Sequence, residues 1–162
     1  MIVEQIPHLR RYALALLGDV ERADDLVQDC LERAWSRFHL FREDGNLRAW
    51  LFTIMHNLNA NAARRASRRP RTVPFDHDRH TVPVSGSQED RVAVSAVSRA
   101  LEDVPVEQRE VVLLVGLEQM TYEEVARILD IPIGTVMSRL HRGRERLRGA
   151  YDGQGPSIRR VK

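Results

Sequence analysis

The chain has 162 residues, of which 43% are hydrophobic and 30% charged, which is enough for one ordinary domain or two small ones. Seven prolines, nine glycines, a mean hydropathy of −0.39 and the lack of a long apolar run exclude fibrous, low-complexity and membrane-spanning classes. The start lacks the pattern of a secretion signal, and a single cysteine, Cys30, fits a reducing compartment, so we expect a cytoplasmic protein with Cys30 as a buried filler.

Charge is strongly segregated along the chain. The net charge is only +2, yet the 25 basic residues are almost all arginine, and they gather in two stretches. Counted from the sequence, the segment charges are −2 for residues 1–63, +3 for 64–91, −5 for 92–136 and +6 for 137–162. This pattern suggests two modules that each present one basic face to a polyanion. Solvated helix ends are the alternative interpretation.

Two amphipathic helices are predicted first. Apolar residues keep to one face over 6–17, and Gly18 then supplies a stop, with Asp19 as the possible N-cap of the next helix. In that helix apolar positions recur at three and four residues over 26–38, while acidic residues fill the outer face. Trp35 lies on this apolar stripe and is therefore expected in the core.

A third helix carries the longest apolar stripe, over 47–58, with Asn46 as its expected N-cap and Trp50 as a core residue. It runs into an arginine-rich end formed by Arg64, Arg65, Arg68 and Arg69. Turn-forming residues then dominate 71–91, which we interpret as a flexible linker.

The C-terminal part is predicted to be a helix-turn-helix domain. Apolar periodicity resumes at Val94, gives two helices and breaks at Gly116. The run T-Y-E-E predicts a capping box in which Thr121 and Glu124 start a new helix. After a short break, Thr135 is expected to open a basic helix. The chain is thus expected to be all-α, with two small helical domains, 1–70 and 92–150, the linker 71–91 and a tail 151–162.

Three segments resemble a known family. ADDLVQDCLERAW (23–35), LRAWLFTIMHNLNANAARR (47–65) and the helix-turn-helix segment 101–148 follow the order of the small, two-domain, extracytoplasmic-function sigma factors of bacterial RNA polymerase. A helix-turn-helix alone is a weak signal, but the two upstream segments make the joint match specific. The resemblance implies a first domain similar to sigma region 2, for core polymerase and the minus-ten promoter element, and a second similar to region 4, for the minus-thirty-five element.

The resemblance also implies a polymerase-binding face. In the family, the helix with the D-L-V-Q word docks on the coiled-coil clamp of the largest polymerase subunit. An exposed acidic helix face is a suitable partner for a basic one, although simple solvation is the alternative. The matching positions are Asp25, Gln28, Asp29, Glu32 and Arg33.

Two DNA-binding faces follow in the same way. The family's next helix and the loop before it melt and read the minus-ten element, which here implies a base pocket from Phe41 to Asn46, a base contact from Asn57 and phosphate contacts from the four arginines Arg64, Arg65, Arg68 and Arg69. Exposed bases need stacking surfaces and a basic track, and Phe41, His56 and the neighbouring asparagines offer these independently of the resemblance.

The second domain of the family places its recognition helix on the minus-thirty-five element and packs on the flap of the other large polymerase subunit. The matching residues are Thr135, Met137, Ser138, Arg139, His141 and Arg142. Met137 occupies a position where many members of the family carry a basic or polar residue. Gly143, inside this helix, should cost about 0.5–1 kcal/mol relative to Ala, so we expect the helix to become firm only on DNA.

No catalysis, cofactor or metal site is predicted. His77 and His80 lack a nearby His or Cys cluster and are interpreted as part of a solvated loop. Three functions stay open: a promoter-specificity subunit, a sigma-like decoy that binds an anti-sigma factor, and a free-standing helix-turn-helix repressor. An anti-sigma factor is expected as a further partner by family analogy, and no membrane insertion is expected.

Overall fold

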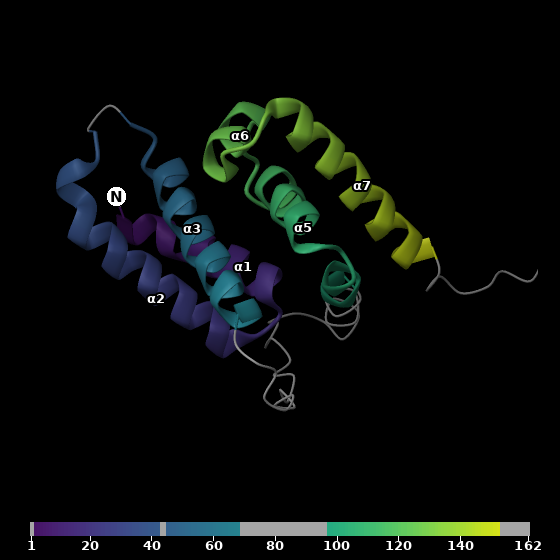
Figure 1. Ribbon diagram of the computed structural model, residues 1–162, viewed down its shortest axis with the longest axis horizontal. Helices are drawn as coiled ribbons and strands as arrows, with labels where there is room; N and C mark the ends of the chain where they lie inside the picture. Colours follow the sequence, from purple (N-terminus) through teal and green to yellow (C-terminus); the bar gives the residue numbers. More distant parts are fainter. Residues whose placement is uncertain (1, 43–44, 69–96, 153–162) are drawn as a thin grey trace, which may run out of the picture.

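The computed structural model describes residues 2–42, 45–68 and 97–152, and these ranges are helical with no strand, as predicted. The N-terminal body contains α1 (Ile2–Leu17), α2 (Val20–Arg37), a 3-10 turn (Phe38–Leu40) and α3 (Leu47–Arg68). The C-terminal body contains a short helical stretch at 97–102, α5 (Val106–Val112), a π-helical turn (Leu113–Leu117), α6 (Tyr122–Leu129) and α7 (Ile133–Asp152). Figure 1 shows the second body lying alongside α3. None of the helices in the described ranges has the length and apolar character needed to cross a membrane.

The N-terminal bundle forms where the apolar period predicts it. Gly18 ends α1 with a φ of +67°, which glycine adopts without strain, and the Asp19 carboxylate caps α2 by accepting from the Arg22 amide at 2.8 Å. Cys30 is fully buried and its Sγ donates to the Leu51 carbonyl at 3.4 Å. Burial raises the pKa of this thiol to about 12, so Cys30 is the inert filler that we expected.

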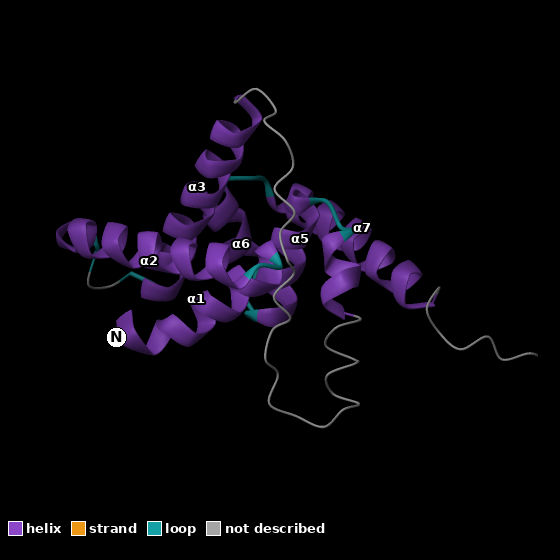
Figure 2. Cartoon of the chain, turned by 90° about the horizontal axis from the view of Figure 1, so that it is seen from below, coloured by secondary structure: helices purple, strands orange, loops and turns teal. Residues whose placement is uncertain are grey.

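Helix α3 is capped by the Asn46 side chain, which accepts from the Ala49 amide at 3.0 Å. Its first half is buried through Leu51, Phe52 and Met55, whereas 61–67 are exposed. Figure 2 shows the C-terminal part of α3 standing clear of the bundle. Arg69 and the predicted linker 71–91 lie outside the described residues.

The C-terminal domain contains the predicted capping box. The Thr121 hydroxyl accepts from the Glu124 amide at 3.2 Å, and the Glu124 carboxylate accepts from the Thr121 amide at 2.9 Å. Two boundaries differ from the prediction. The helical backbone continues past Gly116 as the π-helical turn and ends only before Gln119, which has a φ of +54°, and α7 begins at Ile133, before Thr135.

Trp35 is not a core residue, contrary to the prediction from periodicity. Its side chain is 81% exposed, while Val27, Cys30 and Ala34 on the same helix are buried. Ala34 takes the contact with the bundle, and the next residue along the helix is rotated by about 100° away from it. Trp50 is half-buried, and its ring centroid lies 5.1 Å from that of Phe41.

Gly143 has a packing role that the sequence did not reveal. It is buried, and a Cβ built on it would lie 2.6 Å from Val112 Cγ2 and 3.4 Å from the Gln108 carbonyl of α5. The missing side chain therefore lets α7 approach α5 closely. Helix α7 is continuous through Gly143, so the expectation of a helix that forms only on DNA is wrong.

The two domains are packed together through one continuous core. Buried residues from α1, α2 and α3 join those of α5, the π-helical turn, α6 and α7 in a single hydrophobic cluster. Helix α3 lies against α6, and α1 lies against the π-helical turn. The Tyr12 and Phe52 rings meet edge to face at 5.1 Å near this boundary. Burial, together with the carboxylates of Glu110 and Glu118, raises the pKa of Tyr12 well above its ordinary value.

Gly143→Ala is expected to destabilise the fold, by about 1–3 kcal/mol, because the β-branched Val112 cannot move aside without repacking α5. Gly149→Ala is the matched control on the same helix, since a Cβ there meets nothing within 4 Å. The control should be neutral or more stable by up to about 1 kcal/mol. Urea unfolding followed by circular dichroism measures both. Equal stabilisation by the two variants would contradict the close α5–α7 contact.

Candidate functional site

Helix α2 presents one exposed polar face. Asp25, Gln28, Asp29, Glu32 and Arg33 are all exposed, on the side of the helix opposite to its buried residues. Gln28 Nε2 donates to Glu32 Oε1 at 3.0 Å, which orders the middle of this face. The structure thus brings together the whole set for which polymerase contact was predicted, and we call it the α2 face.

Trp35 extends the α2 face, and the sequence analysis missed it. It lies seven residues after Gln28, about two helical turns, so both side chains emerge on the same side. A large exposed aromatic next to charged groups is typical of an interaction surface. No local signal in the sequence separates Trp35 from the buried stripe, since the same helix buries the adjacent residues Leu26 and Val27.

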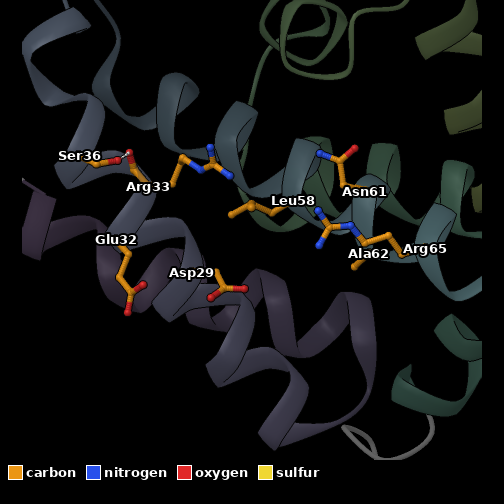
Figure 3. Close-up of a pocket in the computed structure, with 8 residues that line it drawn as sticks. All are labelled: Asp29, Glu32, Arg33, Ser36, Leu58, Asn61, Ala62 and Arg65. Carbon is orange, nitrogen blue, oxygen red and sulfur yellow. Dashed lines mark hydrogen bonds between the residues drawn. The ribbon is translucent and has the colours of Figure 1, made fainter.

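The α2 face shares a groove with α3. A hollow of about 540 Å³ is lined by Asp29, Glu32 and Arg33 from α2 and by Asn61 and Arg65 from α3. Figure 3 shows the two acidic side chains along one wall and Arg65 on the other. A smaller hollow of about 250 Å³ adjoins it. Its wall includes Arg33, Asn57, Asn61 and Arg64. Residues predicted for polymerase and for DNA therefore meet along one groove.

Side chains of the loop before α3 already contact other residues of the chain, whereas the prediction of a base pocket implies that they are free to meet a base. The Phe41 ring stacks with Phe38 at 5.9 Å between centroids and lies against Trp50. The Asn46 side chain caps α3 and also donates from Nδ2 to Glu124 Oε1 at 2.7 Å. Residues 43 and 44, inside the predicted pocket, lie outside the described residues.

The basic end of α3 is open to solvent. Arg64 and Arg65 are exposed, and Arg64 is oriented by hydrogen bonds to the Asn61 side chain at 3.1 Å and to the Ala60 carbonyl at 3.3 Å. Asn57 is also exposed, two turns earlier on the helix. The side chain of Arg68 and the whole of Arg69 lie outside the described residues.

Helix α7 presents the second basic face. Val136, Leu140 and Gly143 are buried against the rest of the domain. The predicted residues occupy the remaining circumference: Met137, His141 and Arg142 are exposed, while Thr135, Ser138 and Arg139 are half-buried. Ser138 Oγ donates to the Thr135 carbonyl at 3.1 Å. This arrangement offers donors and one apolar side chain to a groove, as base reading requires.

No group of three or more metal-ligating side chains lies within the described residues. The His77 and His80 pair is outside them.

Comparisons with known proteins match both domains. Residues 2–56 match the family model of the Sigma2 domain of PhyR, and residues 95–147 match that of Sigma-70, region 4. The ECF RNA polymerase sigma factor EcfG of Rhodopseudomonas palustris is 36% identical over 146 residues, which cover 90% of this chain and 80% of that protein.

Solved structures show the same similarity. The sigma factor RpoE of Bartonella quintana, in complex with the anti-sigma factor NepR, is 30% identical with a TM-score of 0.77, over 95% of this chain and 96% of that one. The anti-anti-sigma factor PhyR of the same species, complexed with NepR, is 16% identical with a TM-score of 0.61, over 91% of this chain and 48% of that one. The PhyR match is a likeness of fold alone.

Proposed function

Because the chain belongs to the ECF RNA polymerase sigma factors, we propose that it binds core RNA polymerase and directs it to promoters through three exposed faces. The observation that carries this proposal is the combination of one acidic helix face with two separate basic faces, on α3 and on α7. A polymerase subunit that reads two promoter elements needs one face for the polymerase and one for each element. Two weak DNA contacts on one chain then give specificity together.

The polymerase contact is assigned to the α2 face. Asp25, Asp29 and Glu32 offer negative charge, and Gln28 and Arg33 add hydrogen-bond donors. The partner surface is the clamp of the largest polymerase subunit, by analogy with the family. The region 4 domain would pack on the flap of the other large subunit.

The DNA contacts are assigned to domains 1–70 and 92–150. On α3, Asn57 faces a base of the minus-ten element and the arginines from Arg64 onward follow phosphates, as single-strand binding requires. On α7, Thr135 contacts a phosphate, while Arg139 and Arg142 reach the major groove of the minus-thirty-five element. Phe41 and Asn46 would form the base pocket after a rearrangement of their present contacts.

The chain is proposed to work in the cytoplasm without catalysis or a cofactor of its own, since nucleotide addition belongs to the core polymerase. We also propose an anti-sigma factor as a regulatory partner. Support comes from the Bartonella sigma factor of similar fold, which was solved with such a partner.

A second candidate is a sigma-like decoy that captures an anti-sigma factor without engaging promoters. The match of residues 2–56 to the Sigma2 domain of PhyR favours it. The exposed arginines on α3 and α7 favour the sigma factor instead, because a decoy has no use for phosphate contacts.

Run-off transcription distinguishes the two candidates. Purified bacterial core polymerase is incubated with a pool of genomic promoter fragments, with and without this protein. New, selective transcripts are expected only with the protein, and their start sites give the promoter motif. Absence of transcripts together with absence of core binding would contradict the sigma-factor assignment and leave the decoy.

The two basic faces should respond differently to substitution. Arg64→Ala and Arg65→Ala should weaken open-complex formation and each lower the slope of binding against salt by about 1, as phosphate contacts do. Arg139→Ala or Arg142→Ala should cost about 1–3 kcal/mol at the upstream element and relax its sequence preference. Filter binding of holoenzyme to promoter variants at several salt concentrations measures these effects.

Arg10→Ala is the matched control for these four variants. Arg10 is exposed on α1 and pairs with Asp24 within the same domain, so its loss removes the same charge away from the proposed DNA faces. Unchanged promoter affinity in all four arginine variants, or an equal loss in the control, would contradict the assigned faces.

Trp35→Ala should weaken the binding of core polymerase by about 2 kcal/mol, roughly thirtyfold in Kd, because exposed tryptophans at the centre of interfaces are common hot spots. The free energy of unfolding should change little, since the side chain is 81% exposed in the free chain. Val3→Ala, at another exposed apolar residue on α1, is the control. Equal core affinity for both variants would exclude Trp35 from the contact with core polymerase.

A further inference from the structure

The carboxylate of Glu118 belongs to the C-terminal domain, but the N-terminal domain binds it. Oε1 accepts from Arg11 Nε at 3.2 Å and from Arg11 Nη2 at 3.0 Å. Oε2 accepts from Arg48 Nη2 and lies 3.1 Å from His8 Nδ1. Within the described ranges, every side-chain partner of Glu118 lies on α1 or α3, although more than 60 residues of sequence separate it from each of them.

The Glu118 carboxylate has these partners only in the closed arrangement, in which α1 and α3 pack on the C-terminal domain. The residue is 1% exposed, and a buried carboxylate is unfavourable unless cations and hydrogen bonds surround it. Arg48 Nη2 also donates to the Glu118 backbone carbonyl at 2.9 Å, which fixes the π-helical turn against α3. If the domains parted, Glu118 and its partners would return to water. The cluster therefore exists only in the closed arrangement, and loss of one partner leaves a buried charge uncompensated there, which favours opening.

Polar contacts that do not involve Glu118 cross the same boundary. Glu110 Oε1 lies 2.9 Å from His56 Nδ1, Asn46 donates to Glu124, and Arg109 Nη1 donates to the Leu16 carbonyl at 2.6 Å. Glu110 is itself buried. The domains are thus joined at several points along α1 and α3.

These contacts occupy part of the surface that the proposed function assigns to DNA. Asn46 and His56 were predicted to contact exposed bases, and here Glu124 and Glu110 hold them. An incoming strand would also bring its phosphates toward the acidic segment 92–136, which carries a charge of −5. Like charges repel, so the closed arrangement and the reading of the minus-ten element oppose each other.

We propose that the free chain is autoinhibited by an intramolecular contact in which the C-terminal domain covers Asn46 and the first half of α3, as far as His56, and Glu118 locks the domains together. Opening of this contact precedes promoter reading by α3. The inhibitory role rests on the proposed function, whereas the closed arrangement can be measured without it.

Arg11→Glu tests the lock from its solvent side. Arg11 is about half exposed, so reversal of its charge should leave the N-terminal bundle folded while it repels Glu118. Arg10→Glu is the matched control, because this neighbour pairs with Asp24 inside its own domain. Small-angle X-ray scattering of the full chain should show a larger radius of gyration for Arg11→Glu and the wild-type value for Arg10→Glu.

Glu118→Gln tests the lock from the other domain, with Glu123→Gln on the exposed side of α6 as its control. Glutamine keeps the shape of the side chain but removes the charge that the two arginines require. The same increase in radius of gyration is expected for Glu118→Gln, whereas Glu123→Gln should keep the wild-type value. Circular dichroism checks that all four variants retain the helical content of the wild type.

Run-off transcription with core polymerase supplies the functional readout. If about 10% or less of the wild-type chain is open, the apparent affinity of the chain in transcription is reduced by that fraction. The concentration of Arg11→Glu that gives half-maximal transcription should therefore fall by about tenfold or more relative to wild type and Arg10→Glu.

The outcomes separate the lock from the function. Expansion with more potent transcription supports the proposal. An unchanged radius of gyration in both lock variants would overturn the role of Glu118, and expansion without a change in half-maximal concentration would overturn the inhibition. Expansion in a chain that drives no transcription in any form would contradict the proposed function and the inhibitory role with it, while the closed arrangement stands.

Discussion

The arrangement of this protein depends on one buried carboxylate. Glu118 is held by Arg11, Arg48 and His8, and these partners come from two different helices of the other domain. A charge in such a site fixes geometry more strictly than apolar packing does, because its partners must lie within hydrogen-bond distance and direction. Together with the shared hydrophobic core and the Asn46–Glu124 and His56–Glu110 contacts, this group holds the C-terminal domain against the first half of α3.

The segregated charge of the sequence serves two purposes in the fold. The acidic segment 92–136 turns three carboxylates, Glu110, Glu118 and Glu124, toward donors of the N-terminal domain. The basic residues of α7 stay on the outer side of the same domain. The C-terminal domain therefore has one face that contacts its partner domain and another that is proposed to bind DNA, and the two faces carry opposite charge.

Local features were predictable from the sequence and tertiary ones were not. The caps at Asp19, Asn46 and Thr121 depend on residues a few positions apart, so the sequence pattern is sufficient to identify them. Trp35 was misplaced because the apolar period does not say how wide a stripe the bundle covers. The packing role of Gly143 and the ion pairs of Glu118 were missed for a different reason: their partners lie on helices distant in sequence.

The polar contacts between the domains favour a reversible opening. The two domains are parts of one chain, so their association is intramolecular and does not depend on protein concentration. Charged groups such as Arg11 and Glu118 regain hydration when the contact opens, which offsets part of the cost of exposing the shared hydrophobic core. A ligand that binds only the open form then shifts the equilibrium by its binding free energy. The α2 face is exposed in the closed form, so a contact of core polymerase with it cannot by itself shift this equilibrium. The shift requires contacts that only the open form offers.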